Sequence, residues 1–308
     1  MWVSHLGCVK GCLEYLGIDV SDAWLFGATG HAFIINIYEV VCPSGPTAWN
    51  TEMLFKLGKN VGYTIDGVFS HKSAADFAEK RRLAWQKTRQ AIDEGLPCYG
   101  WELDIAEYHV VYGYDEEGYY YRDFDNSGKG PKPWRDLGGT EIGMVEMYIV
   151  KPAEASDDTT TVKEAFRFVL EHSKSPSKWI FPKYKAGFEG FDNWISALQT
   201  GNANGFGVAY NAVVWSECRG FAVRFLEEAK ERLSSELSPL LDKAVGYYRV
   251  VAENLESVSK IFPFKGSATK GEEVKDPERV KKALQHLKTA RKAEESGLRT
   301  LDKISAKL

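Results

Sequence analysis

The chain has 308 residues, of which 44% are hydrophobic and 27% are charged, and its formal net charge at pH 7 is −4. This composition is typical of a soluble globular protein and argues against a disordered chain. Without a basic surplus the chain is not expected to bind nucleic acid, and without an apolar run of about 18 residues it is not expected to enter a membrane. The length allows one large domain or two of medium size, and we expect two.

The cysteines are odd in number and far apart in the sequence: Cys8, Cys12, Cys42, Cys98 and Cys218. Such a set in a long chain argues against a disulfide framework and for a reducing compartment. The first residues, Met-Trp-Val-Ser-His, lack the basic start and apolar core of a signal peptide. We therefore expect a cytoplasmic protein whose thiols are free for chemistry.

The first third of the chain mixes helical and strand patterns. Apolar spacing and glycine stops predict short helices over residues 6–16 and 19–27. The β-branched and aromatic run 32–41 predicts a buried strand. Helical spacing returns over 52–62 and 73–95.

Four segments then alternate or run apolar, with turn-forming residues between them: 97–103, 108–114, 119–123 and 144–150. Short strands separated by tight turns favour an antiparallel meander. The remainder has helical spacing over 162–171, 191–198, 209–233, 237–262 and 277–308.

A polar, turn-rich stretch after residue 152 separates these two halves and predicts a domain boundary. We expect an α+β domain with an antiparallel sheet over residues 1–152. An all-α domain is expected over residues 160–308.

A cysteine near the N-terminus is the first candidate for chemistry. A thiol becomes a useful nucleophile as the thiolate, which a helix N-terminus or a cationic histidine stabilises. Cys8 lies in the first turns of the predicted opening helix, whereas Cys12 lies one turn further in. Cys8 is therefore the preferred nucleophile, although both thiols would equally fit a buried core.

A histidine and an aspartate follow on two consecutive predicted strands. Alternation places the His109 ring on the same face as Val111, and the next strand ends in Asp123. A carboxylate beside the ring would fix its tautomer. His109 is thus the candidate base and Asp123 the candidate orienting acid, while Asp125 fits a turn cap better.

Two further patterns near the N-terminus have both a functional and a structural interpretation. His5, Cys8 and Cys12 share one helical face and could offer three zinc ligands, but no second cysteine pair supports that site, and no metal or cofactor is expected. The Gly-Ala-Thr-Gly-His31 turn either brings His31 to a substrate or is a plain turn with a buried histidine.

One helix of the second half carries polar groups on an aromatic stripe. Asn211 and Trp215 lie one turn apart and could line a substrate pocket. A helix interface with one hydrogen-bonded asparagine explains the same pattern.

Together these segments resemble a known family: Cys8, the segment from Leu13 to Gly17 (Leu-Glu-Tyr-Leu-Gly), the Gly-His31-Ala-Phe turn, the strand opening at His109 (His-Val-Val-Tyr-Gly-Tyr), and Tyr-Arg-Asp123. They are similar to the N-terminal domain of butirosin biosynthesis protein H, which looks papain-like and akin to double-glycine leader peptidases. The helical remainder is similar to the C-terminal part of such proteins. Counted from the Tyr-Leu-Gly motif, the family's nucleophile position falls near Ser4.

The resemblance implies thiol-dependent acyl transfer, or amide or thioester hydrolysis, through Cys8, His109 and Asp123. The implied substrate is a small-molecule or peptidic acyl compound, with an acyl carrier protein as a possible donor. The alternative from another functional class is a non-catalytic ligand-binding or scaffolding protein on a degenerate papain-like fold. Which thiol reacts, if any, stays open at this point.

Overall fold

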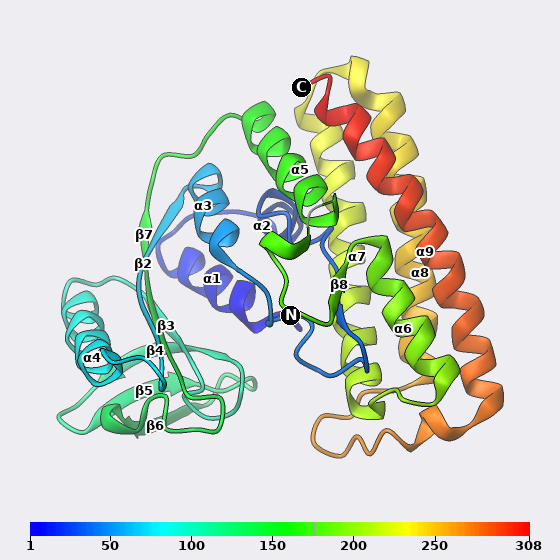
Figure 1. Cartoon of the computed structure of the whole chain (residues 1–308). Helices are drawn as coiled ribbons and strands as arrows, with labels where there is room; N and C mark the ends of the chain where they lie inside the picture. Colours follow the sequence, from blue (N-terminus) through cyan, green and yellow to red (C-terminus); the bar gives the residue numbers. More distant parts are fainter. Residues whose placement is uncertain (175) are drawn as a thin grey trace. The chain divides into compact units, whose positions relative to one another are not determined.

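The computed structural model describes residues 1–174 and 176–308. It divides into two compact units, each built from separated stretches of chain. The first unit comprises residues 1, 3–20 and 62–155, and the second comprises residues 2, 21–61 and 156–308. Helices and antiparallel sheets are both present, and the C-terminal region is helical (Figure 1).

A six-stranded antiparallel sheet forms the centre of the first unit, in the order β2-β7-β3-β4-β5-β6. Its strands are β2 (Tyr63–His71), β3 (Cys98–Trp101), β4 (Tyr108–Tyr114), β5 (Gly118–Arg122), β6 (Gly128–Pro133) and β7 (Met144–Pro152). The expected meander is present, but the sequence did not predict β2 or β6. β2 is interrupted by Asp66 and Gly67, and β6 contains two prolines, so neither shows a clean strand pattern.

Two helices cover the two faces of this sheet, α1 (Ser4–Tyr15) on one and α4 (Phe77–Asp93) on the other (Figure 1). On the α1 face, the ring of Tyr108 lies 4.4 Å from that of His5. On the α4 face, Val111 packs in one apolar cluster with Trp85 of α4. Alternation along β4 therefore assigns even-numbered side chains to α1 and odd-numbered ones to α4 up to Val111.

The second unit is mainly helical. Its helices are α2 (Asp22–Ala28), α3 (Glu52–Val61), α5 (Asp158–Lys174), α6 (Phe188–Thr200), α7 (Gly205–Arg232), α8 (Ser238–Ile261) and α9 (Pro277–Ser305). Short 3-10 turns are η1 (Trp134–Asp136) in the first unit and η2 (Pro176–Lys178), η3 (Ser235–Leu237) and η4 (Glu272–Lys275) in the second. A two-stranded sheet pairs β1 (Asn36–Tyr38) with β8 (Tyr184–Ala186).

The strand predicted over 32–41 is reduced to β1. Only the three residues of β1 have strand partners, on β8, while the preceding apolar residues are buried in a turn in which the Ala32 amide donates to the Phe26 carbonyl. The run is apolar because it is buried, and burial alone does not distinguish a strand from an irregular core segment.

The domain boundary also needs correction. A boundary does fall between residues 155 and 156, close to the predicted one, but residues 21–61 belong to the second unit. Their apolar side chains pack on its helices, as the stacked rings of Phe26 and Phe221 show at 4.2 Å. Linear patterning does not reveal which distant helices an apolar segment will pack against.

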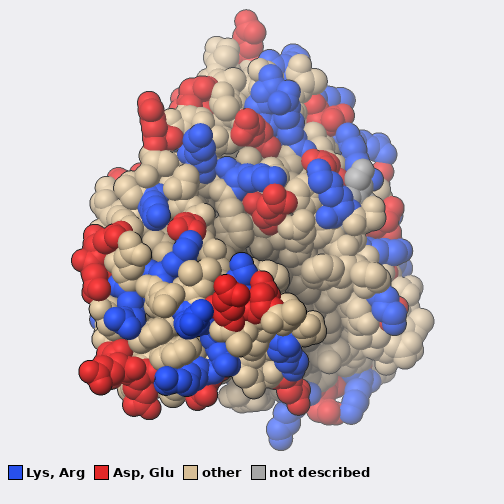
Figure 2. All heavy atoms as spheres, turned by 60° about the vertical axis from the view of Figure 1, so that its left-hand side comes forward, with Lys and Arg blue, Asp and Glu red and all other residues tan. Residues whose placement is uncertain are grey.

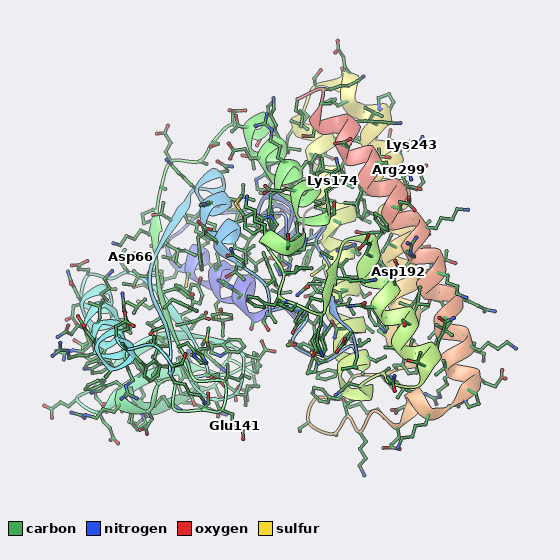
Figure 3. The ribbon with its side chains drawn as sticks, viewed as in Figure 1. Asp66, Glu141, Lys174, Asp192, Lys243 and Arg299 are labelled. Carbon is green, nitrogen blue, oxygen red and sulfur yellow. The ribbon has the colours of Figure 1, made fainter. Side chains whose placement is uncertain are left out.

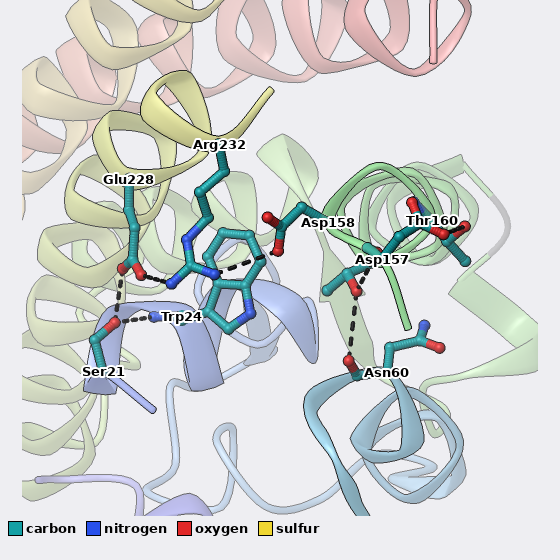
Figure 4. A network of polar contacts seen from close by, with 9 residues as sticks. Ser21, Trp24, Asn60, Asp157, Asp158, Thr160, Glu228 and Arg232 are labelled. Carbon is teal, nitrogen blue, oxygen red and sulfur yellow. Dashed lines mark hydrogen bonds and ion pairs between the residues drawn. The ribbon is translucent and has the colours of Figure 1, made fainter. Parts of the chain in front are cut away.

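A polar network fixes α2 in the second unit (Figure 4). Ser21 caps α2 by accepting from the Trp24 amide at 2.9 Å, and its hydroxyl donates to Glu228 of α7 at 2.7 Å. Arg232 pairs with Glu228 and with Asp158 of α5, and its guanidinium lies 3.9 Å from the centre of the Trp24 ring. One arginine thus joins three helices through charge and ring contacts.

Acidic and basic side chains are interspersed over the face of the molecule shown in Figure 2. No helix of the described residues combines the length and the apolar composition that crossing a bilayer requires.

The core of the second unit contains a fully buried ion pair between Arg219 of α7 and Glu294 of α9. The guanidinium donates to both carboxylate oxygens, at 2.9 and 2.8 Å, and to the carbonyls of Ala32 and Ile34 at 2.8 and 2.9 Å. Burial raises the pKa of Glu294, and the arginine opposes that rise. The pair therefore ties the 32–34 turn to two helices.

We predict that Glu294→Gln lowers the free energy of unfolding by about 3–5 kcal/mol, because it leaves the Arg219 charge buried without a counter-charge. Urea unfolding measures the change. The matched control is Asp192→Asn, which breaks the bidentate but partly exposed pair of Asp192 (Figure 3) with Arg291 and should cost less than about 1 kcal/mol. Equal losses in the two variants would contradict this view of the core.

Candidate functional site

The opening helix begins earlier than the sequence predicted. α1 starts at Ser4, and Val3 precedes it without a side-chain cap. Cys8 consequently lies in the second turn, where its amide is already committed to the helix, and Ser4 occupies the first helical position. Cys8 therefore lies beyond the free amides of the helix N-terminus.

Both thiols of α1 are buried. The exposed fraction of Cys8 is 7%, and that of Cys12 is 0%. Burial, with the nearby charge of Glu107, raises the pKa of the Cys8 thiol well above its usual range. Burial and the neighbouring thiols of Cys8 and Cys98 raise the pKa of Cys12 as well. Each is therefore a neutral thiol at physiological pH.

His109 faces away from the helix that carries Cys8. Its neighbour Tyr108 faces α1, where the Tyr108 amide donates to Ser4 Oγ at 3.1 Å and the ring contacts His5. Side chains alternate along a strand, so His109 points to the α4 face, as its contact with the Tyr121 ring at 5.4 Å shows. The structure does not bring Cys8 and His109 together.

The hydrogen bonds of the His109 ring determine its tautomer. Nδ1 lies 3.1 Å from the carbonyl of Arg122, which can only accept, so Nδ1 carries the proton. Burial lowers the pKa of His109, and the Arg122 carbonyl and the charge of Asp104 oppose that fall. In the neutral ring Nε2 is then an acceptor, and it is buried without a partner among the described residues.

Asp123 lies just after β5 but does not orient His109. Its Oδ1 accepts from the Phe124 amide at 2.8 Å, and its Oδ2 pairs with Lys129 Nζ at 2.5 Å. The hydrogen bond from Lys129 and that from the Phe124 amide lower the pKa of Asp123. The backbone carbonyl of Arg122 takes the place that the sequence assigned to this carboxylate.

A buried polar network fills the space between α1 and the sheet instead. His5 Nε2 lies 2.9 Å from the hydroxyl of Tyr99, while Tyr108 and Tyr148 both donate to Glu146. Burial raises the pKa of Glu146, and the two tyrosine hydrogen bonds oppose the rise. A single glutamate within the apolar run of β7 was the sequence signal for this network, and it was missed.

The same network engages His5, the histidine of the zinc alternative. His5 uses Nε2 to contact Tyr99, and its ring lies among three tyrosine rings. Among residues 1–174 and 176–308 no three His, Cys, Asp or Glu side chains are arranged to hold a metal ion.

His31 is a buried histidine of the second unit. Its Nδ1 lies 3.7 Å from Cys218 Sγ, and its ring stacks on that of Trp215 at 6.2 Å. Burial lowers the pKa of His31 to about 3, although a backbone hydrogen bond opposes the change. A neutral ring packed among indoles agrees with the structural interpretation of the Gly-Ala-Thr-Gly-His turn.

Asn211 and Trp215 are buried, and Asn211 holds the loop of Cys42 by a hydrogen bond. Asn211 Oδ1 accepts from Trp215 Nε1 at 2.9 Å, and its Nδ2 donates to the carbonyls of Gly207 and Cys42 at 2.8 and 2.9 Å. Both side chains are fully buried. Of the three residues predicted to bind substrate, His31 and Trp215 are in contact, and Asn211 connects Trp215 to Cys42.

Comparison with known proteins does not assign the chain to a family. No protein-family model matches the chain, and no curated protein is significantly similar to it.

The burial of His172 affects how the stability of the fold depends on pH. The pKa of His172 is lowered to about 3 by burial, with smaller effects from His31 and Arg219, and neither ring nitrogen has a partner among the described residues. Between pH 6.5 and 3 the His172 imidazole therefore binds a proton in the unfolded chain but not in the folded chain. The free energy of unfolding consequently falls as the pH falls. We predict that His172→Phe makes this decline shallower by up to roughly 1.4 kcal/mol per pH unit.

Urea unfolding at several pH values measures this slope. A His172→Phe slope identical to that of the unmodified chain would contradict the prediction.

Proposed function

We propose that this chain is a non-catalytic ligand-binding or scaffolding protein on a degenerate papain-like fold. The observation that carries the proposal is the placement of Cys8 and His109 on opposite faces of one sheet. The papain-like part rests on the order of its elements: a cysteine-bearing helix comes first, and a strand histidine follows in an antiparallel sheet. This order agrees with the resemblance to the butirosin biosynthesis protein H family.

Acyl transfer through Cys8, His109 and Asp123 would require three conditions that this arrangement does not meet. The thiol would have to ionise, but burial and Glu107 disfavour its charged form. The base would have to reach the sulfur, but β4 directs His109 to the other face. The acid would have to orient the base, but Asp123 is paired with Lys129.

Binding, in contrast, fits the state of His109. Its Nε2 is an acceptor without a partner in the part of the chain that the structure describes, and the exposed ring of Phe124 lies 5.2 Å from the imidazole. Leaving a buried acceptor unpaired costs about 1–3 kcal/mol, which a ligand donor would recover. We therefore infer a small-molecule or peptidic ligand that brings an N–H or O–H donor to Nε2 and apolar surface to Phe124.

The proposal predicts that the Cys8 thiol reacts slowly and that its reaction rate does not depend on His109. We expect slow alkylation of Cys8 by iodoacetamide in the native protein from pH 6 to pH 9, with the same rate in His109→Ala. Site-resolved peptide mass spectrometry reads the rate, and the urea-unfolded chain gives the reference rate for a freely accessible thiol.

Fast labelling of Cys8 at pH 6 that disappears in His109→Ala would overturn the proposal. It would reveal a thiolate–imidazolium pair and support the acyl-transfer alternative, with peptidic, small-molecule or carrier-bound acyl donors to be screened next. Circular dichroism of the variant confirms that the comparison is made between folded proteins.

A further inference from the structure

The second unit contains a group of reactive side chains that the proposed function does not use: Cys42, Ser44 and Tyr184. Cys42 Sγ lies 2.6 Å from Ser44 Oγ, which lies 2.6 Å from Tyr184 Oη, and the sulfur is 3.9 Å from the same phenol. Cys42 is partly exposed, whereas the other four cysteines of the chain are buried. The accessible thiol is therefore the one with two hydroxyl groups beside it.

The loop that carries Cys42 is held closely against α7. Asn211 Nδ2 donates to the Cys42 carbonyl, and the Asn204 amide donates to the Val40 carbonyl at 2.8 Å. A methyl group added at Gly207 would lie 2.0 Å from the Val41 carbonyl oxygen, so only glycine permits this approach. The backbone that carries the thiol is thus held in place by these contacts with α7.

Strained backbone precedes both ends of the group. Val41 and Lys183 adopt left-handed φ values of 57° and 74°, directly before Cys42 and Tyr184. A β-branched residue is rarely found in this region, and such strain costs on the order of 1–3 kcal/mol where the surroundings maintain it. The fold therefore maintains two unfavourable conformations at the positions that set this geometry.

A buried acceptor without a partner among the described residues lies on β1, beside this loop. Asn36 Nδ2 donates to the carbonyls of Gly45 and Ala48 at 2.9 and 3.0 Å, which places the amide against the loop of Cys42 and Ser44. Its Oδ1 has no partner among the described residues, although Asn36 is fully buried. Two hydroxyl groups thus lie beside the thiol, and the unused acceptor lies on the strand whose amide contacts the loop.

The phenol acts as a donor at physiological pH. Burial raises the pKa of Tyr184 to about 12, while the hydrogen bond with Ser44 opposes the rise. Two neutral hydroxyl groups suit a reaction in which negative charge develops on oxygen, because O–H donors to an oxyanion form strong, charge-assisted hydrogen bonds. If the thiol attacked a disulfide instead, the leaving group would be a thiolate, which these hydroxyl groups would stabilise less than an oxyanion.

We propose that Cys42, assisted by Ser44 and Tyr184, is a site of oxidation by small hydroperoxides. The sulfur attacks the terminal oxygen of the hydroperoxide, the one that carries hydrogen. An S–O bond forms, and the O–O bond breaks. The departing alkoxide or hydroxide takes up the proton lost by the thiol, so that Cys–SH and ROOH give Cys–SOH and ROH. The product is a sulfenic acid that an external thiol can reduce through a mixed disulfide.

The test treats the full-length protein with hydrogen peroxide and traps sulfenic acid with dimedone, followed by peptide mass spectrometry of all five cysteines. We expect the adduct on Cys42 ahead of every other cysteine. Tyr184→Phe keeps the ring against Tyr38 but removes the donor, and we expect it to slow oxidation roughly tenfold, as Ser44→Ala should.

Tyr38→Phe is the matched control, because Tyr38 stands opposite Tyr184 in the strand pair, and it should keep the rate of the unmodified chain. Labelling of Cys42 no faster than that of the buried cysteines overturns the proposal, as does an unchanged rate in both Tyr184→Phe and Ser44→Ala. The same digest reports Cys8 separately. Failure at Cys42 is therefore distinguishable from failure of the proposed function, which only a reactive Cys8 would show.

Discussion

The strict alternation of side chains along β4 is the constraint on which the chemistry of the first unit depends. Tyr108 meets His5 on the α1 face, and the next residue, His109, must point to the α4 face. A shift of one residue in register would exchange these faces and turn the imidazole toward α1. The bonds from Tyr108 to Ser4 and Glu146 hold the present register, so they also keep the histidine away from Cys8.

Much of the first unit was readable because strands of a meander are local in sequence. β4 has the predicted bounds, and alternation correctly grouped His109 with Val111. What sequence could not show was which face α1 would cover, because the partner of a helix is set by packing between distant segments. At that step the structure separates the candidate residues: their types suit the chemistry, but Cys8 is on the helix of the α1 face and His109 points to the α4 face.

The helices of the second unit were predicted well where their apolar stripes are long, as in α8 and α9. The buried polar residues were not. Arg219 and Glu294 look like surface charges in the sequence, and only the structure shows that each is fully buried and satisfied by the other. For Asn211 the sequence allowed either a pocket wall or a hydrogen-bonded helix interface, and the structure shows its amide in backbone and indole hydrogen bonds. Polar residues in cores depend on partners that no local pattern contains.

The division of the chain into units has a consequence for how the protein is made. Residues 21–61 leave the ribosome early, but the helices they pack against follow only after residues 62–155 have been synthesised. Until then the apolar rings of Trp24, Phe26 and Phe33 have no permanent partners. The sheet-bearing insertion can fold during this interval, whereas the helical unit must wait for its final segments. Nascent chains of this protein are thus exposed to aggregation for longer than a simple tandem of two domains would be, and chaperones that hold apolar segments should matter to its yield.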